Sequence, residues 1–307
     1  MVQKKHFPLL LWVIAIFLHS SVVRAQNGAM VYLTDFGLKD GAVAAMKGVA
    51  FGVSPQLKQF DLTHEIPPFN IWEGAYRLQQ TIPYWPAGTV FIVVVDPGVG
   101  SERLPVVAKT KAGHYIVTPD NGTLTLVADG VGIDSLRQID ESINRLPGSG
   151  DSYTFHGRDV FAYTAARLAA GVIQFQQVGN DIPPTPKTLP YQKALVDGDK
   201  IRGNIPVLDP QYGNIWTNIP VSLLKNWGIN DNDRLEVEIS DGKRLVYKGM
   251  VPYGNTFSDV PEGKPVAYVN SLLNLSFGIN MGNFARTYKV GSGSGWTVSI
   301  RKPRPGD

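Results

Sequence analysis

The chain has 307 residues, with 29 Lys and Arg side chains, 26 Asp and Glu side chains and no cysteine. The absence of cysteine excludes disulfides, zinc–thiolate sites and cysteine nucleophiles. Three basic residues, Lys4, Lys5 and Arg24, lie in the first 25 residues, so the rest of the chain carries 26 charges of each sign. This balance gives no electrostatic reason to expect nucleic acid or an anionic membrane as a partner.

Residues 1–25 have the three-part pattern of a secretory signal, with a basic start, an apolar run over 7–18 and a small-residue site ending at Ala25. The apolar run is shorter than the roughly 20 residues that a membrane span needs. We therefore expect an exported protein, periplasmic or secreted, that has no membrane association after cleavage behind Ala25. An uncleaved anchor is the alternative, since Arg24 is unusual so close to a cleavage site.

Residues 29–185 alternate apolar runs of strand length with helical patterns, which is typical of an α/β domain with a largely parallel sheet. Strands are expected in AMVYLTDFG, LKQFDLTHEIPP and TVFIVVVDPG, and the unbroken apolar run of the last suits burial on both faces. One helix is expected over 42–53. A second follows Asn70, an N-cap with Glu73 three residues later, and a third, GRDVFAYTAARLAAG, ends at Gly171.

The sequence changes character after the proline-rich segment DIPPTPKTLPYQ, so residues 186–200 are expected to be a linker. Residues 201–307 contain short alternating segments, RLEVEIS, KRLVYKGMV, KPVAYVN and WTVSIRK, and one helical pattern, VSLLKNWGI. These patterns predict a smaller, all-β C-terminal domain, either a barrel or a sandwich.

Polar turns follow three of the predicted strands of the first domain and contain Asp35, His64 and Asp96. Ligands of open α/β sheets bind beyond the carboxyl ends of the strands, so these side chains should stand along one edge. Each also has a structural explanation. Asp-Pro-Gly is common turn chemistry, Asp35 can cap a turn or helix, and His64 can be a satisfied loop histidine.

Three further segments combine polar groups in ways that suit a binding site. His156 stands just before the third helix, where capping or packing is the plain explanation. TPDNGTLT, residues 118–125, reads as a turn into a helix. LDPQYGNIWTN brings Asp209, Tyr212 and Asn214 together, either as a rigid surface turn or as half of a pocket that stacks on and hydrogen-bonds a base.

Several common catalytic motifs are missing from the sequence. It has no G-x-x-x-x-G-K-[ST] phosphate loop, no G-x-S-x-G elbow, no H-E-x-x-H helix and no EF-hand loop. No cluster of His, Asp and Glu predicts a metal site, so we expect neither a metal nor a cofactor.

Six segments, in the same order, resemble the S-adenosyl-L-methionine (SAM) hydroxide adenosyltransferases, SAM hydrolases related to the fluorinase and chlorinase. They are LTDFGLKDGAVAAMKGVAFGVSP, DLTHEIPPFNIWEGAYRL, GTVFIVVVDPGVGSER, TPDNGTLT, TFHGRDVFA and DPQYGNIWTN. The resemblance covers nearly all of the chain after residue 25. It implies an N-terminal α/β domain, a C-terminal β-barrel, and a homotrimer whose active sites lie between one subunit's N-terminal domain and its neighbour's C-terminal domain. SAM is then the substrate, and no cofactor is needed.

The resemblance implies that Asp96, Arg103 and His156 position and activate a water molecule. The related halogenases carry an aromatic residue in place of Asp96 and a serine in place of Gly157, so this sequence looks like the branch that uses water. Such a set suits the reaction, because cleavage of the C5′–S bond of SAM releases a neutral thioether without a general acid. The reaction is then limited by its nucleophile, because water is weak and must be held in line with that bond.

Ligand contacts are implied in both domains. Asp35 matches the residue that holds the ribose diol, and Phe69 matches an aromatic residue beside the ligand. In the C-terminal domain, Asp209 matches the contact to the methionine ammonium, Tyr212 a ring that stacks on adenine, and Asn214 a hydrogen bond to the base edge.

Ser271, in YVNSLLNLSFG, matches a contact to the methionine carboxylate. The sequence departs from the pattern here, since Leu272 stands where the fluorinase has an arginine. The predicted export is a second departure, because SAM is made and used in the cytoplasm.

Two other functions remain open from the sequence. An exported, non-catalytic binding protein for SAM or a nucleoside would need Asp35, Tyr212 and Asn214 but none of the three proposed catalytic residues. A halide-using SAM transferase is disfavoured by Asp96 and Gly157.

Overall fold

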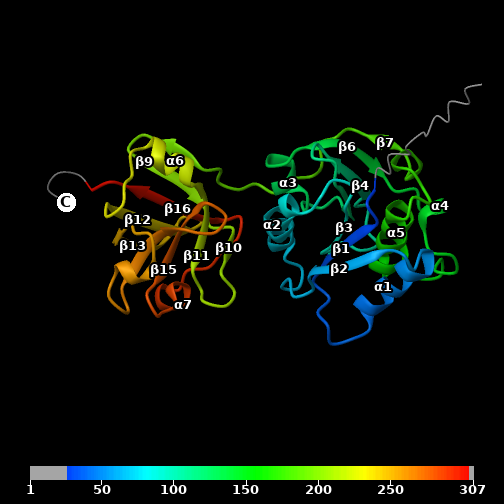
Figure 1. Cartoon of the computed structure of the whole chain (residues 1–307), viewed down its shortest axis with the longest axis horizontal. Coiled ribbons are helices and arrows are strands. Elements are labelled where there is room, and N and C mark those ends of the chain that lie inside the picture. The colour runs from blue at the N-terminus through cyan, green and yellow to red at the C-terminus, as the bar shows by residue number, and fades with distance from the viewer. Residues whose placement is uncertain (1–25, 304–307) are drawn as a thin grey trace, which may run out of the picture.

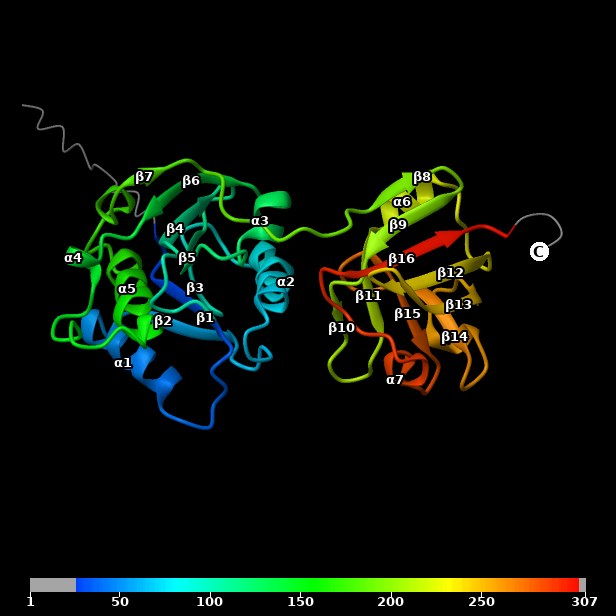
Figure 2. The same ribbon diagram turned by 180° about the vertical axis from the view of Figure 1, so that it is seen from behind.

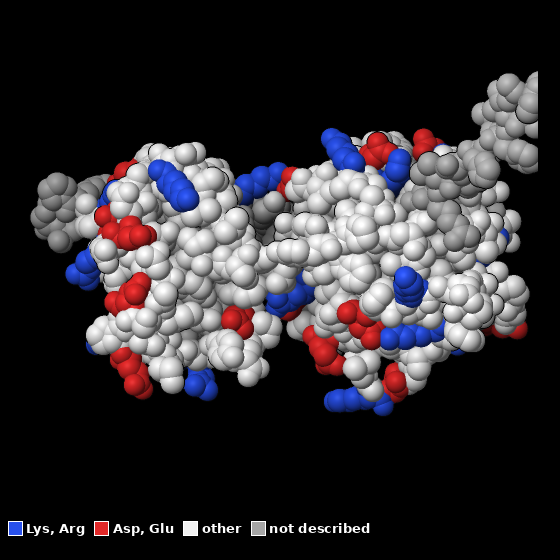
Figure 3. Space-filling model, in the orientation of Figure 1, with Lys and Arg blue, Asp and Glu red and all other residues white. Residues whose placement is uncertain are grey.

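The computed structural model describes residues 26–303, which form two domains joined by one extended connector (Figure 1). The predicted signal, residues 1–25, lies outside the described residues. Among the residues described, no helix is both long and apolar enough to cross a membrane. Basic and acidic side chains are interspersed on the face drawn in Figure 3, without a large patch of one sign.

The N-terminal domain is built on a seven-stranded sheet with the order β2-β1-β3-β5-β4-β6-β7. The strands are β1 (Ala29–Thr34), β2 (Lys58–Thr63), β3 (Val90–Val94), β4 (Pro105–Thr110), β5 (Tyr115–Pro119), β6 (Ile133–Gln138) and β7 (Asp181–Ile182). The pairings among β2, β1, β3 and β5 are parallel, and those from β5 through β4 and β6 to β7 are antiparallel.

The sheet is therefore mixed, which corrects the largely parallel sheet that we predicted. The reason lies in the short connection between β4 and β5. Four residues separate the two strands, which allows a hairpin but is far too short for the crossover that parallel neighbours need.

Helices cover both faces of this sheet (Figures 1 and 2). The helical elements of the domain are α1 (Ala42–Val53), α2 (Ile71–Thr81), η1 (Ile82–Tyr84), α3 (Thr125–Asp129), α4 (Glu141–Asn144), η2 (Gly157–Ala162), α5 (Tyr163–Ala169) and η3 (Phe175–Gln177). Met30 and Tyr32 of β1 share a core with residues of α1 and α5, whereas Val31 and Leu33 share a second core with residues of α2 and α3. This alternation follows from the two-residue period of a strand and explains why the buried strands are apolar throughout.

The C-terminal domain consists of two antiparallel sheets around one apolar core. The first has the order β10-β11-β15-β14 and the second β13-β12-β16-β9-β8. The strands are β8 (Leu195–Asp197), β9 (Lys200–Asn204), β10 (Val207–Leu208), β11 (Ile215–Pro220), β12 (Arg234–Asp241), β13 (Arg244–Pro252), β14 (Pro265–Val269), β15 (Asn274–Ile279) and β16 (Trp296–Arg301). Among the described residues, the two sheets are linked only by an isolated bridge between Tyr253 and Ala267, and no continuous strand ladder joins them, so they do not form the closed barrel that we expected.

Three short helices complete the C-terminal domain: α6 (Val221–Asn226), η4 (Phe257–Asp259) and α7 (Phe284–Tyr288). Of these, α6 was predicted from its sequence pattern. The segment of α7 carries a side-chain cap, since Asn283 accepts a hydrogen bond from the amide of Arg286 at 2.7 Å.

The connector between the domains, residues 183–194, contains no helix or strand and is bound to the N-terminal domain. Tyr191 donates a 2.7 Å hydrogen bond to Asp129 at the end of α3, and Lys193 forms a 2.9 Å ion pair with the same carboxylate. The Trp72 indole on α2 donates to the carbonyl of Pro206 at 3.0 Å. Strand β8 falls inside the stretch 186–200 that we had assigned to the linker.

Candidate active site

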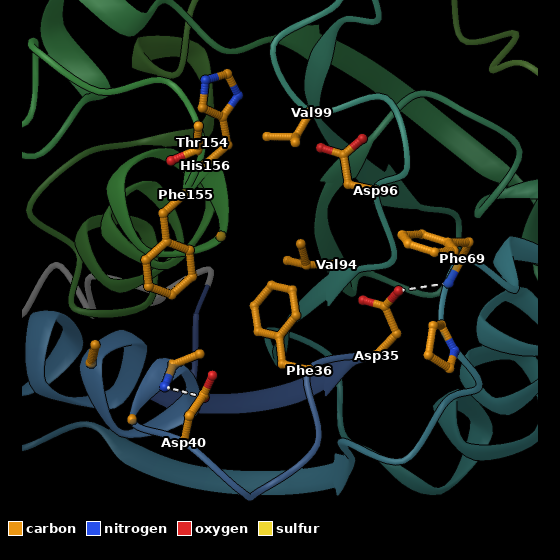
Figure 4. A pocket seen from close by; sticks show the side chains of 15 residues that line it. Asp35, Phe36, Asp40, Phe69, Val94, Asp96, Val99, Thr154, Phe155 and His156 are labelled. Atoms are coloured by element: carbon orange, nitrogen blue, oxygen red, sulfur yellow. Dashed lines mark hydrogen bonds between the residues drawn. The ribbon is translucent and has the colours of Figure 1, made fainter.

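A cavity of about 720 Å³ opens beyond the carboxyl ends of β1 and β3, and every residue that lines it lies between positions 35 and 157 (Figure 4). Asp35 follows β1 and Asp96 follows the neighbouring parallel strand β3, so the sheet brings both carboxylates to one wall. His156 lines the cavity beside them.

His64 does not line this cavity, although its turn also lies at the sheet edge. Its ring is buried, with Nδ1 2.8 Å from Thr34 Oγ1 and Nε2 3.0 Å from Asp61 Oδ1. Both ring nitrogens therefore have partners within the fold. His64 is therefore a loop histidine whose hydrogen bonds are satisfied within the fold.

The turn after β3 folds back so that Arg103 lies on Asp96. The amide of Val99 donates to the Asp96 carbonyl at 3.2 Å, and the amide of Ser101 donates to the Gly98 carbonyl at 3.0 Å. Arg103 Nε then donates to both carboxylate oxygens of Asp96, at 3.0 and 2.9 Å, and Nη2 donates to Oδ2 at 2.5 Å. Both side chains are almost completely buried, so the ion pair is held rigidly by the surrounding protein.

Asp96 and Arg103 differ in their access to the cavity. The Asp96 carboxylate lines it, whereas Arg103 stands behind that carboxylate, with its guanidinium 5.4 Å from the Phe161 ring. Arg103 therefore acts on the contents of the cavity through the groups it binds. One of those groups is His156, whose Nδ1 lies 2.8 Å from Arg103 Nη2.

His156 immediately precedes the π-helical turn η2, which continues into α5. We predicted a regular helix here, but the first turns are widened, a feature that is frequent at functional sites. A Cβ atom added at Gly157 would lie 3.1 Å from the Phe36 ring and 3.3 Å from the Phe155 ring. The absence of a side chain at Gly157 lets these two rings close over the start of the helix.

His156 is held in its neutral form by its surroundings. Burial lowers the pKa of the imidazole, and the charges of Arg103 and Arg145 lower it further, while Glu141 and Asp96 oppose the shift. The imidazole is therefore uncharged at neutral pH. A neutral ring has one nitrogen that can accept a hydrogen bond, and the Arg103 contact at Nδ1 uses such an acceptor.

Asp35 and Phe69 are linked directly, because the Phe69 amide donates a 2.9 Å hydrogen bond to Asp35 Oδ2 (Figure 4). Phe69 has a φ of 68°, a left-handed conformation that is unusual for a phenylalanine and is more common at functional sites. Its ring is 70% exposed at the edge of the cavity. Asp35 thus holds an exposed aromatic ring in place and keeps Oδ1 for another partner.

The three predicted binding residues of the turn between β10 and β11 also lie together. Asp209 Oδ1 accepts from the amides of Gln211 and Tyr212, at 3.0 and 3.3 Å, and Oδ2 accepts from Asn214 Nδ2 at 3.2 Å. Asn214 is buried, whereas the Tyr212 ring is 65% exposed. None of these side chains lines the cavity of the same chain.

Ser271 is not part of that cluster. It lies in the turn between β14 and β15, and Asn274, just beyond it, pairs with Pro220 at the far end of β11. Asn214 precedes Ile215 at the opposite end of the same strand. The length of β11 separates the two groups by about 17 Å at the usual rise of a strand.

Asp40 is a cavity residue that we did not single out from the sequence. Its carboxylate accepts a 2.9 Å hydrogen bond from the amide of Ala42 at the start of α1. In Figure 4 it lies across the cavity from Asp96 and His156. The sequence does place Asp40 just before the first helix, but an aspartate there is usually a capping residue, so its position alone does not indicate a binding role.

Within residues 26–303, no group of three or more His, Cys, Asp or Glu side chains is arranged to hold a metal ion.

Comparison with known proteins identifies the family. A model of the SAM hydroxide adenosyltransferase N-terminal domain matches residues 30–179, and a model of the C-terminal domain of the same family matches residues 203–297. The chain is also similar to a crystal structure of a conserved protein from Thermotoga maritima, with a TM-score of 0.79 and 33% identity. That similarity covers 89% of this chain and 100% of the other.

Two relatives are named (R)-S-adenosyl-L-methionine hydrolase. The relative from Methanocaldococcus jannaschii is 40% identical over 190 residues, which are 61% of this chain and 65% of that protein. The relative from Salinispora tropica is 35% identical over 256 residues, which are 83% of this chain and 91% of that protein. The chain therefore belongs to the SAM hydroxide adenosyltransferase family.

Proposed function

We propose that the protein hydrolyses SAM to adenosine and L-methionine by in-line attack of water at ribose C5′. The observation that carries this proposal is the buried network of Asp96, Arg103 and His156, two members of which face a cavity large enough for a nucleoside. The names of the relatives support the same reaction.

The charge of the cavity suits a cationic substrate. SAM carries a sulfonium, an ammonium and a carboxylate, and is therefore a cation overall. Asp35 and Asp40 both line the cavity, and neither has an ion pair among the described residues. They can offset the positive charge of the substrate, whereas the charge of Asp96 is balanced by Arg103.

In the proposed reaction, Asp96 holds the attacking water. Arg103 fixes the carboxylate through three contacts and leaves further lone pairs on its oxygens as acceptors. As the water oxygen bonds to C5′, the electron pair of the C5′–S bond moves to sulfur. One water proton is lost toward Asp96 and then to solvent, so the products are neutral adenosine, zwitterionic methionine and a proton.

The packing around Gly157 argues against halide as the nucleophile. A serine here, as in the halogenases, would place its Cβ 3.1 Å from the Phe36 ring, closer than most real contacts of that kind. Phe36 and Phe155 fill the space that a side chain at this position would need. Water held by Asp96 is the nucleophile that this arrangement favours.

We also propose a homotrimer in which the C-terminal domain of a neighbouring subunit completes each cavity. This proposal is supported by two exposed aromatic rings, Phe69 at the cavity and Tyr212 in the C-terminal domain, that have no stacking partner among the described residues of one chain. A neighbour that brings Tyr212, Asn214 and Asp209 over the cavity would enclose the adenine.

The sequence of residues 1–25 supports export, and we propose that the mature protein acts in the periplasm or outside the cell. There it would act on SAM that has left the cytoplasm. The names of the relatives specify the (R) form, so the epimer at sulfur is a property that the reaction should be tested for.

The test is incubation of the protein from Gln26 onward with each sulfonium epimer of SAM, and quantification of adenosine and methionine by chromatography. We expect equal amounts of both products at a rate that does not depend on added chloride. The Asp96→Asn variant should bind SAM but release almost no adenosine. Binding without turnover by the unmodified protein would favour an exported binding protein, and chlorinated adenosine would favour a halide transferase.

A further inference from the structure

Arg145 lies behind His156, on the side away from Arg103. It follows the short helix α4, and its side chain is only 12% exposed. Arg145 Nη2 is 3.2 Å from His156 Nε2, whereas Arg103 Nη2 is 2.8 Å from Nδ1. The imidazole is thus held between two guanidinium groups.

The same guanidinium organises the loop that leads from α4 to the cavity. Arg145 Nη1 donates to the carbonyls of Ser149 and Ser152, both at 3.3 Å, and the group stacks on the Tyr153 ring at 4.6 Å. This loop ends in Thr154, Phe155 and His156, which form one wall of the cavity.

Arg145 is itself held by one carboxylate. Glu141 Oε2 accepts from Nε at 3.2 Å and from Nη2 at 2.8 Å, across one turn of α4. The forked contact fixes the plane of the guanidinium, which a lysine ammonium could not do.

The two guanidiniums restrict the protonation of His156. A neutral imidazole has one acceptor nitrogen and an imidazolium has none, so only one of the two contacts is a full hydrogen bond in the neutral ring. Protonation of the imidazole would remove its last acceptor nitrogen, and with it both guanidinium contacts. It would also add a positive charge beside Arg103 and a cationic substrate. The shorter distance favours Nδ1 as the acceptor, from Arg103, so Arg145 acts on the ring through its charge and through the loop that it holds and not through a hydrogen bond to Nε2.

We propose that Arg145 is a positioning residue for the reaction, which together with Glu141 orients His156 and keeps it neutral against the Asp96–Arg103 pair. The proposal rests on the proposed function for its kinetic part. It assigns no contact with substrate to Arg145, which does not line the cavity.

Arg145 and Glu141 carry opposite charges, so removing each charge should shift the pKa of His156 in opposite directions. The charged groups around His156 are Asp96, Arg103, Glu141 and Arg145, and the Tyr153 ring is 6.4 Å from the imidazole. Burial and Arg103 lower its pKa first, with Arg145 adding to that effect and Glu141 opposing it. The proposal requires the neutral ring for activity, so activity should be lost as the pH falls through the pKa of His156 in the folded protein.

The variants Arg145→Gln and Glu141→Gln should therefore move this acid limit in opposite directions. Arg145→Gln leaves Glu141 unopposed, raises the pKa and moves the loss of kcat to higher pH, with kcat at neutral pH reduced roughly tenfold by the looser loop. Glu141→Gln removes the opposing carboxylate and moves the loss to lower pH. Glu73→Gln, which breaks the same kind of pair with Arg77 on α2, is the control and should leave the limit unchanged.

Proton NMR titration of the His156 ring, assigned by loss of its signal in His156→Asn, measures the same shifts without any turnover. If SAM is not hydrolysed but the two titrations still move apart, the proposed function fails and the positioning role stands. If both variants titrate like the unmodified protein, or move in the same direction, Arg145 has no such role. Arg145→Lys, which retains the charge, should keep the titration and lose only part of kcat.

Discussion

The N-terminal cavity and the C-terminal turn at residues 209–214 are built in different ways. Asp96, Arg103 and His156 are buried and joined by contacts of 2.5 to 3.0 Å. In the C-terminal turn, by contrast, the proposed recognition group is the ring of Tyr212, a residue that is 65% exposed. Groups that act on the reacting atoms must be in place before the substrate arrives, whereas a stacking ring can be supplied by a second subunit.

Asp96→Asn should have the largest effect, because it removes the carboxylate that we propose orients the water and leaves Arg103 without its counterion. We expect kcat to fall by roughly a thousandfold and the protein to lose about 3 kcal/mol of stability. Steady-state kinetics and thermal unfolding measure the two effects. Asp134→Asn, in an exposed ion pair with Lys109, is the control and should change neither by much.

Coexpression of Asp96→Asn and Tyr212→Ala subunits tests whether the two regions come from different chains. If each site is shared between two subunits, it is intact when an Asp96 comes from a Tyr212→Ala subunit and a Tyr212 comes from an Asp96→Asn subunit. Random mixing makes roughly a quarter of the sites intact in this way and should restore about that share of the unmodified activity. Sites formed within one chain would remain impaired in every subunit. The measurement is the specific activity of the purified mixed oligomer beside each variant expressed alone, at a SAM concentration well below KM, where the Tyr212→Ala defect limits the rate.

Tyr212→Ala should raise KM about tenfold and change kcat much less, since we propose that the ring stacks on the base and not on the reacting atoms. Tyr212→Phe keeps the ring and should behave like the unmodified protein. An equal fall in kcat for both variants would mean that the hydroxyl takes part in the reaction, contrary to this account.

Gly157→Ala should destabilise the protein by about 2 kcal/mol, because the new methyl group crowds the rings of Phe36 and Phe155. It should also reduce kcat several-fold by moving His156. Gly150→Ala, where an added Cβ has no neighbour within 4 Å, is the matched control. Unchanged thermal unfolding in Gly157→Ala would show that the rings of Phe36 and Phe155 can move aside without a loss of stability, contrary to this account.

Ser271→Ala should have the smallest effect, with KM within about twofold of the unmodified protein. The reason is its place at the opposite end of β11 from Asn214. A much larger rise in KM would support the contact to the methionine carboxylate that the family resemblance implies.

Much of the N-terminal fold could be predicted from local patterns. The helices α1 and α2 and the strand β3 appear in the sequence as amphipathic or continuous apolar runs, and Asn70 accepts the amide of Glu73 at 3.0 Å as its spacing suggested. The antiparallel β4 and β5 were missed, because their pairing depends on the length of a turn and not on apolar periodicity. In the C-terminal domain the strands were visible, but the closure of a barrel depends on pairings that no local pattern specifies.

The candidate site shows the same division between local and distant information. Asp35 and Asp96 could be placed together because they follow adjacent strands of one sheet. The contact of Arg103 with His156, and that of Arg145 with the same ring, join residues that local patterns do not connect. His64, like Asp96, lies in a polar turn after a strand, yet both of its ring nitrogens are paired with Thr34 and Asp61.

The most direct test of the account is a single-turnover reaction in oxygen-18-labelled water, with enzyme in excess over SAM and the products analysed by mass spectrometry. Direct attack of water at C5′ predicts that adenosine carries the label in its 5′-hydroxyl from the first turnover and that methionine carries none. Unlabelled adenosine together with label on Asp96 would contradict this. It would show that the carboxylate itself attacks C5′ and that water only releases the resulting ester.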